Sequence, residues 1–276
     1  MRRITSRHNP IVARFRTVAR GETADLLLLD GVHLVLEAMA AGLPIRQAVF
    51  LADAADRPEL QTLSARLQQL HVATVTAGAP VMHALSPVRS SSPVVAVADR
   101  PRGEAGHVYR DTPLAIVAVD VQDPGNLGAI VRVAEAGGAT GVVATGASAD
   151  PFGWKALRGS MGSALRLPIV SSPDGIAAIG EARRHFCRVI ATVPRRGRSL
   201  FEVDLTGPVA VLIGGEGQGL TPSLVEAADE RVTIPMQPPV ESLNAAVTAA
   251  LVVYEARRQR QKPRQKLTHL AATSLF

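Results

Sequence analysis

The chain has 276 residues, of which 47% are apolar, so it can form one large or two ordinary domains with a full core. Its apolar runs are far shorter than the roughly 20 residues that cross a membrane, and its basic start lacks the apolar core of a signal peptide. A single cysteine, Cys187, excludes an internal disulfide and a Cys-rich zinc site, and the histidines lack metal-ligand spacing. We expect a cytoplasmic protein without a metal.

Arginine dominates the positive charge. The net charge is +6, and 27 of the 30 basic residues are Arg. Arg forms bidentate contacts with phosphate and stacks on bases, so this composition is typical of proteins that bind polyanions such as RNA. Genome composition and a solvated surface would explain the same charge, and the charge alone does not separate the two interpretations.

The first hundred residues alternate strand and helix patterns and predict a small α/β domain, residues 1–98. A cap and a first-turn proline open the first helix, and Gly42 closes the second. In chain order we expect a helix over 10–16, a strand over 26–29, a helix over 32–41, a strand over 45–50, a helix over 59–70, and strands over 72–75 and 94–98.

Residues 99–112 are polar and aperiodic, which predicts a linker. A second α/β domain follows over 113–262, and 263–276 are expected to form a loose tail. The domain should contain strands over 114–119, 141–144, 189–192, 209–213 and 232–234, and helices over 127–136, 175–185, 222–228 and 244–260.

The first candidate site segment follows the expected strand over 114–119. Residues 123–125 should form a turn before a helix that begins near Leu127, where free amides favour an anion or a polar ligand group. Asn126 would then lie in the loop, and Arg132 would reach back from the second turn. Alternatively, Asn126 only caps the helix and Arg132 is a solvated surface residue.

The second segment, residues 214–220, contains four glycines, which let a backbone approach a ligand closely. A dinucleotide-binding fingerprint would need glycine where Leu220 stands, and no phosphate-binding Gly-Lys-Ser/Thr follows. Glu216 would also repel phosphate. The pattern therefore indicates a ligand that is not a polyphosphate, and it disfavours a nucleotide-dependent oxidoreductase.

The third segment holds Ser242 and Asn244 and opens a long helix with small residues on its early face, where another helix or a partner chain could pack. Either residue could be only the helix cap. Because open α/β sheets bind ligands at the carboxyl ends of their strands, we expect the three segments to form one composite site.

These three segments, in this order, resemble the signature motifs of the SpoU (TrmH-type) RNA ribose 2′-O-methyltransferases. The resemblance covers residues 114–260 and includes Asp150-Pro151 and residues 155–162. Residues 4–10 and 30–38 are similar to the substrate-binding domain that precedes the catalytic domain in many members. The resemblance implies a parallel-sheet catalytic domain with a trefoil knot, an L30e-like first domain and a homodimer formed across the catalytic domains.

The resemblance also implies a cofactor, S-adenosylmethionine, and roles for individual residues. Arg132 would activate the 2′-hydroxyl, or bind a phosphate and stabilise the developing alkoxide, since a guanidinium is not readily deprotonated. The other catalytic candidates would hold the loops or the ribose. The catalytic set is Asn126, Arg132, Glu216, Ser242 and Asn244, and the cofactor set is Thr192, Gly214, Gly215, Gly217, Gly219, Ile234, Met236 and Leu243.

The expected substrate is RNA, with rRNA favoured over tRNA because of the two-domain layout. The first domain should supply RNA affinity through Arg2, Arg3 and Arg7, with Arg158 added from the second. No membrane or metal partner is expected. The alternative is a non-catalytic RNA-binding or ribosome-assembly protein on the same fold, against which the intact motif residues argue.

Overall fold

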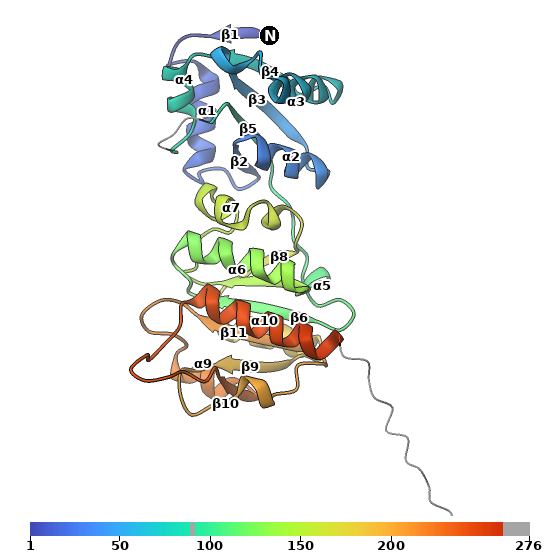
Figure 1. The fold of residues 1–276 in the computed structure, drawn as a ribbon, viewed down its shortest axis with the longest axis vertical. Helices are drawn as coiled ribbons and strands as arrows, with labels where there is room; N and C mark the ends of the chain where they lie inside the picture. The colour runs from blue at the N-terminus through green and yellow to red at the C-terminus, as the bar shows by residue number, and fades with distance from the viewer. Residues whose placement is uncertain (89–91, 262–276) are drawn as a thin grey trace, which may run out of the picture.

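The computed structural model describes residues 1–88 and 92–261, which form two α/β halves, each built on its own sheet (Figure 1). The first sheet has the strand order β1-β4-β3-β5-β2, and the second has the order β10-β12-β9-β11-β6-β7-β8. The expected tail, 263–276, lies outside the described residues. No helix in the described part of the chain is long and apolar enough to cross a membrane.

The first half contains the expected helices and strands, together with one short strand and one short α-helix that the sequence pattern did not predict. The additional elements are β1, which buries only Ile4 against β4, and α4, which packs against α1. The elements are β1 (Arg2–Ile4), α1 (Pro10–Ala19), β2 (Leu26–Asp30), α2 (Val32–Ala40), β3 (Ile45–Leu51), α3 (Pro58–Gln69), β4 (Ala73–Ala77), α4 (Ala79–Leu85) and β5 (Val94–Asp99).

The second half is a parallel α/β domain, as expected, because every strand pair in its seven-stranded sheet is parallel. The trefoil knot stays a prediction. The elements are α5 (Ala105–Val108), β6 (Leu114–Val119), α6 (Pro124–Gly137), β7 (Gly141–Thr145), α7 (Trp154–Ser160), β8 (Ile169–Ser172), α8 (Gly175–Arg184), β9 (Arg188–Thr192), β10 (Arg198–Ser199), β11 (Val209–Gly214), α9 (Pro222–Ala227), β12 (Glu230–Thr233) and α10 (Ala245–Gln261).

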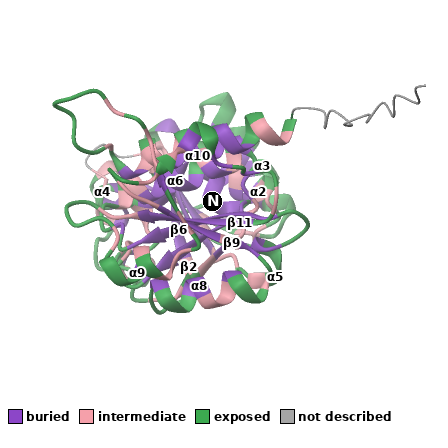
Figure 2. Ribbon diagram, turned by 90° about the horizontal axis from the view of Figure 1, so that it is seen from below, coloured by how far each residue is buried: buried purple, intermediate pink, exposed green. Residues whose placement is uncertain are grey.

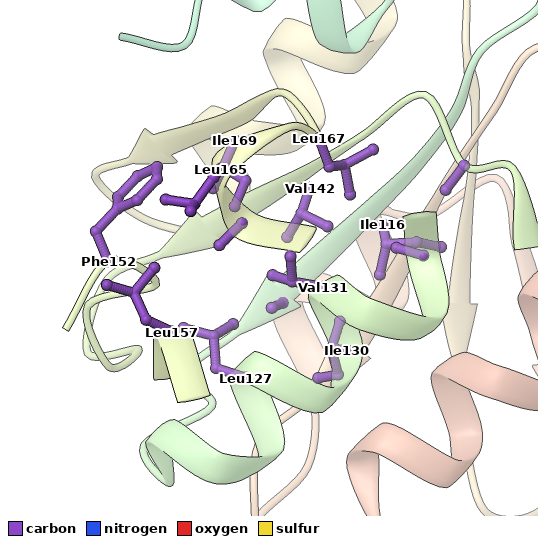
Figure 3. Close-up of a cluster of buried hydrophobic side chains, with 14 of the residues drawn as sticks. Ile116, Leu127, Ile130, Val131, Val142, Phe152, Leu157, Leu165, Leu167 and Ile169 are labelled. Carbon is purple, nitrogen blue, oxygen red and sulfur yellow. The ribbon is translucent and has the colours of Figure 1, made fainter. Parts of the chain in front are cut away.

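Helices cover both faces of the second sheet, so its central strands are buried (Figure 2). On one face, Leu127 and Ile130 of α6 pack in a cluster with Ile116 and Val142 of the sheet (Figure 3). Helix α10 lies on that face beside α6 (Figure 1). Helix α8 covers the other face with its own buried cluster.

The two halves meet at α7, which lies between them (Figure 1). Trp154 of α7 packs against the core of the first half. Arg166 forms ion pairs with Glu37 of α2 and, at 2.8 Å, with Glu135 of α6. The segment expected to be a linker contains α5 and buries Tyr109 against the second half, so it is docked rather than free. The domain boundaries stay a prediction.

Candidate active site

The three motif segments converge at one edge of the parallel sheet. Strands β6 and β11 are neighbours in register, with Gly214 opposite Val119, so the loops that follow them emerge together. A cavity of about 420 Å³ opens at this edge, between the loops after β9, β11 and β12 and the start of α10. Its volume lies in the range of roughly 300–1,000 Å³ that is common for small-molecule sites.

All eight residues expected to contact the cofactor line this cavity: Thr192, Gly214, Gly215, Gly217, Gly219, Ile234, Met236 and Leu243. Three of the expected catalytic residues, Glu216, Ser242 and Asn244, line it too. Sequence reasoning missed Gln218, Leu220, Ala245 and Thr248, which also border it. Thr248 lies one helical turn after Asn244, so helix periodicity could have found it.

The glycine-rich loop is packed tightly against the protein itself. A Cβ atom added to Gly215 would lie 2.0 Å from the carbonyl oxygen of Asp120, and one added to Gly214 would lie 2.5 Å from the carbonyl carbon of Gly219. Gly217 and Gly219 have φ values of +92° and +64°, which favour glycine. The loop conformation therefore requires glycine at several positions, apart from any need of a ligand.

The side chain of Asn126 connects the three motif segments. The position of Asn126 also corrects the expected start of the helix that follows β6. The helix begins at Pro124 rather than near Leu127, so Asn126 lies in its first turn instead of the preceding loop. Asp123 caps the helix by accepting a 2.8 Å hydrogen bond from the amide of Asn126. A proline in the first helical turn explains this early start, and it leaves the Asn126 side chain free for other contacts.

Both polar atoms of the Asn126 side-chain amide form hydrogen bonds. Its Nδ2 donates to Glu216 Oε1 at 2.5 Å, and its Oδ1 accepts from Asn244 Nδ2 at 3.0 Å. Asn244 also caps α10 through its Oδ1, which accepts from the amides of Ala246 and Val247. One chain of hydrogen bonds thus connects the three motifs, although they are far apart in sequence.

We expect Asn126→Asp to lower methyl transfer about a hundredfold at neutral pH, because the donor to Glu216 is lost and two carboxylates face each other. At low pH such a pair shares one proton, and the protonated oxygen restores a donor. The ratio of variant to wild-type activity should therefore rise as the pH falls toward roughly 5.

Asn126→Ala is the matched control, since it removes the donor without adding a charge. The ratio of its methyl-transfer activity to that of the wild type should stay constant over the same pH range in a tritium-transfer assay. A flat ratio for Asn126→Asp would show that the hydrogen bond to Glu216 does not control activity.

Asn126 and Arg132 are the two expected catalytic residues that do not line the cavity, and only Asn126 is hydrogen-bonded to residues that do. Arg132 is exposed on α6, and no ion pair or hydrogen bond joins its side chain to another described residue. The neighbouring helix α10 exposes an apolar stripe at helical spacing, with Val247, Leu251 and Tyr254 exposed by 47%, 39% and 50%. Arg132 therefore lies on a surface that another molecule could cover.

The four Arg residues expected to bind RNA lie apart. Arg2 and Arg3 are exposed on β1, the edge strand opposite to β2, and Arg7 donates to the carbonyl of Pro80 at 3.1 Å. Arg158 is exposed on α7, which packs against β2 and against the first half of α6. These residues therefore form two separate basic regions rather than one.

Cys187 is buried beside the start of β9, and burial raises the pKa of its thiol to about 11. A thiol of this kind is protonated at neutral pH, which suits packing rather than nucleophilic chemistry. Within residues 1–88 and 92–261, no group of three or more His, Cys, Asp or Glu side chains is placed to hold a metal ion.

Comparison with known proteins identifies the family. The SpoU rRNA methylase family model matches residues 113–254. A Synechocystis protein described as an uncharacterized tRNA/rRNA methyltransferase is 34% identical over 93% of both chains. A Bacillus subtilis 23S rRNA (guanosine(2553)-2′-O)-methyltransferase is 27% identical over 93% of this chain and 100% of its own.

A solved structure is similar over nearly the whole chain. It is the SpoU methyltransferase AviRb from Streptomyces viridochromogenes in complex with the cofactor AdoMet, with a TM-score of 0.83 and 28% identity. The match covers 93% of this chain and 100% of AviRb, so both halves have the same arrangement of elements as that enzyme. Together with the convergent motif loops, these similarities show that the chain belongs to the SpoU rRNA methylase family.

Proposed function

We propose that this chain transfers the methyl group of S-adenosylmethionine to a ribose 2′-hydroxyl of ribosomal RNA. The observation that carries the proposal is the cavity at the sheet edge, where the hydrogen-bonded set of Asn126, Glu216 and Asn244 meets the glycine-rich loop. The chain is an S-adenosylmethionine-dependent RNA methyltransferase of this family.

The chemistry of the cavity fits the cofactor. Among the described residues, no Lys, Arg or His lines the cavity and Glu216 is the only charged one that does, so the lining suits a ligand with a cationic sulfonium better than a polyphosphate. Ile213, Ile234 and Leu243 supply apolar contact, and the glycine-rich loop offers backbone groups. When bound there, S-adenosylmethionine supplies the activated methyl group.

The protein's own contribution is to position the ribose and to stabilise charge on its 2′-oxygen. Asn126 and Asn244 fix the geometry of the loops, and Glu216 is held by the Asn126 amide. Arg132 acts as a cation that binds a neighbouring phosphate or stabilises the developing alkoxide. Ser242, exposed at the cavity, is placed to contact the ribose.

A homodimer would place Arg132 beside a cofactor cavity, that of the partner protomer. The exposed stripe of Val247, Leu251 and Tyr254 on α10 adjoins α6, which carries Arg132. Exposed apolar stripes of this kind favour association, and a twofold dimer pairs the same surface of both copies. In such a dimer, Arg132 of one protomer would complete the site of its partner.

The proposed substrate is rRNA rather than tRNA, because the first half adds a second basic region beyond the catalytic domain. Arg2, Arg3 and Arg7 would contact phosphates there, and Arg158 would do so beside α6. The similarity to named rRNA methyltransferases disfavours the rival function, a non-catalytic RNA-binding protein, which would bind rRNA without modifying it.

The test is methyl transfer from tritiated S-adenosylmethionine to rRNA from a strain that lacks the corresponding gene, followed by mass-spectrometric mapping of 2′-O-methyl groups. We expect one modified nucleotide in rRNA and none in tRNA. RNA binding without transfer would support the rival function, and modification of tRNA alone would overturn the rRNA assignment.

A further inference from the structure

One ion pair connects two segments that border the candidate cofactor cavity. Pro194, in the loop after β9, lines the cavity, and Arg195 follows it directly. Arg195 Nη2 lies 3.2 Å from Oε1 of Glu241, which directly precedes the cavity residue Ser242. Neither Arg195 nor Glu241 lines the cavity itself, so the pair lies at its border rather than inside it.

The backbone on both sides of Arg195 is anchored. The amide of Val193 donates to the carbonyl of Val232 at 2.8 Å, and the amide of Gly197 donates to Thr233 Oγ1 at 2.9 Å. Arg196, at the tip of the loop, has a φ of +64° and is exposed. A loop held in this way presents a cation at a fixed place, which lowers the entropy lost when a ligand binds.

The ion pair itself is easily exchanged. The side chains of Arg195 and Glu241 are 70% and 80% exposed, and exposed pairs of this kind stabilise proteins very little. A phosphate accepts two parallel hydrogen bonds from a guanidinium and is a stronger partner. The carboxylate of Glu241 therefore holds the guanidinium without binding it tightly.

We propose that Arg195 binds a backbone phosphate of the substrate RNA and that this phosphate displaces Glu241 from the guanidinium. The inference rests on the proposed function, since it assumes an RNA substrate at this cavity. A phosphate held at the border of the cavity positions the nucleotide whose ribose must approach the cofactor. Glu241 thereby weakens binding of RNA until the exchange takes place.

The experiment compares Arg195→Ala with the matched control Arg184→Ala in the full-length protein. Arg184 is 69% exposed and paired with Glu181, but it is the last residue of α8 and does not line the cavity. Binding to a fluorescein-labelled stem–loop of rRNA is measured over a series of KCl concentrations. Arg195→Ala should weaken binding about tenfold and make the slope of log K against log salt shallower by about 0.7–0.9.

Two further readouts separate phosphate binding from a structural role. Arg195→Ala should raise KM for RNA with little change in kcat, and its affinity for S-adenosylmethionine should stay within about twofold of wild type, since Arg195 does not line the cavity. Arg184→Ala should leave the RNA affinity and the salt slope unchanged. A loss of cofactor affinity equal to the loss of RNA affinity would overturn the proposal.

Glu241→Gln tests the exchange. It should strengthen RNA binding about threefold in the wild-type background. In the Arg195→Ala background the gain should be smaller, because only direct repulsion between the carboxylate and RNA remains. An equal gain in RNA affinity in both backgrounds would overturn the proposed displacement of Glu241 by phosphate. If the wild type transfers no methyl group to any RNA, the proposed function fails. If the wild type is active but Arg195→Ala leaves RNA affinity and the salt slope unchanged, only this inference fails.

Discussion

Gly214→Ala should lower the affinity for S-adenosylmethionine about a hundredfold, nearly as much as Gly214→Val. The Cβ atom itself would lie 2.5 Å from the carbonyl carbon of Gly219 and 2.6 Å from the amide nitrogen of Leu220. A single methyl group is therefore enough to push the glycine-rich loop away from β11. Calorimetric titration measures the affinity, and the rise in melting temperature on adding cofactor gives an independent readout.

The comparison of Ala with Val separates two causes. From the sequence alone, a branched side chain at this position would be expected to occupy the space that the ligand needs. The structure instead places the added atom against the loop's own backbone. If the added side chain only blocked the ligand, Gly214→Ala would lower the cofactor affinity far less than Gly214→Val. That result would contradict a clash with the loop's own backbone.

The control is Gly106→Val, because Gly106 is exposed and a Cβ atom there meets nothing within 4 Å. It should bind the cofactor like the wild type. Its melting temperature without cofactor should also match that of the wild type, so that any loss of affinity in the Gly214 variants is assigned to the loop.

Continuous apolar runs made the central strands predictable. Residues 114–119 were expected as a strand, and β6 has those bounds, since all six of its residues are buried by helices on both faces of the sheet. Strand β8 escaped notice because it is four residues long, lies at the sheet edge and ends in two serines. Helix α7 includes Gly159 and owes its place to packing against α6, which a local pattern does not record.

The composite site was predictable in its parts but not in its connections. The position of the motif loops after parallel strands predicted that they would meet, and the cavity at the sheet edge agrees with this. The pairing of Asn126 with Glu216 and Asn244 depends on side-chain geometry between residues that are 90 and 118 positions apart, which spacing does not encode. The ion pair of Arg195 and Glu241 could not be predicted from the sequence for the same reason.

Arg132 was expected to reach back from the second turn and flank the ligand, although it does not share a helix face with Asn126. Six residues turn a helix by about 600°, which places the two side chains on different faces. Within one chain, Arg132 is therefore exposed and outside the cavity. We propose that its use in catalysis depends on a second molecule, and the exposed stripe on α10 indicates where a second copy would bind.

Arg132→Ala should lower methyl transfer about a thousandfold and leave cofactor affinity nearly unchanged, because a preorganised charge at a developing oxyanion contributes about this factor. Arg132→Lys should recover part of the activity if charge is what matters. A variant with wild-type activity would show that the catalytic face has been assigned to the wrong residue. Size-exclusion chromatography should give both variants the same oligomeric state as the wild type.

Mixed dimers decide which protomer supplies the arginine. Arg132→Ala retains the cofactor cavity, and Gly214→Val retains Arg132, so each variant alone should be inactive. If Arg132 serves the partner's site, a mixed dimer contains one complete site, and an equal co-expressed mixture should show about a quarter of wild-type activity. If Arg132 serves its own chain, no dimer contains a complete site and the mixture stays inactive. That result would remove the reason for placing catalysis at the α6–α10 surface, whereas the recovered activity would tie the apolar stripe of α10 directly to the chemistry.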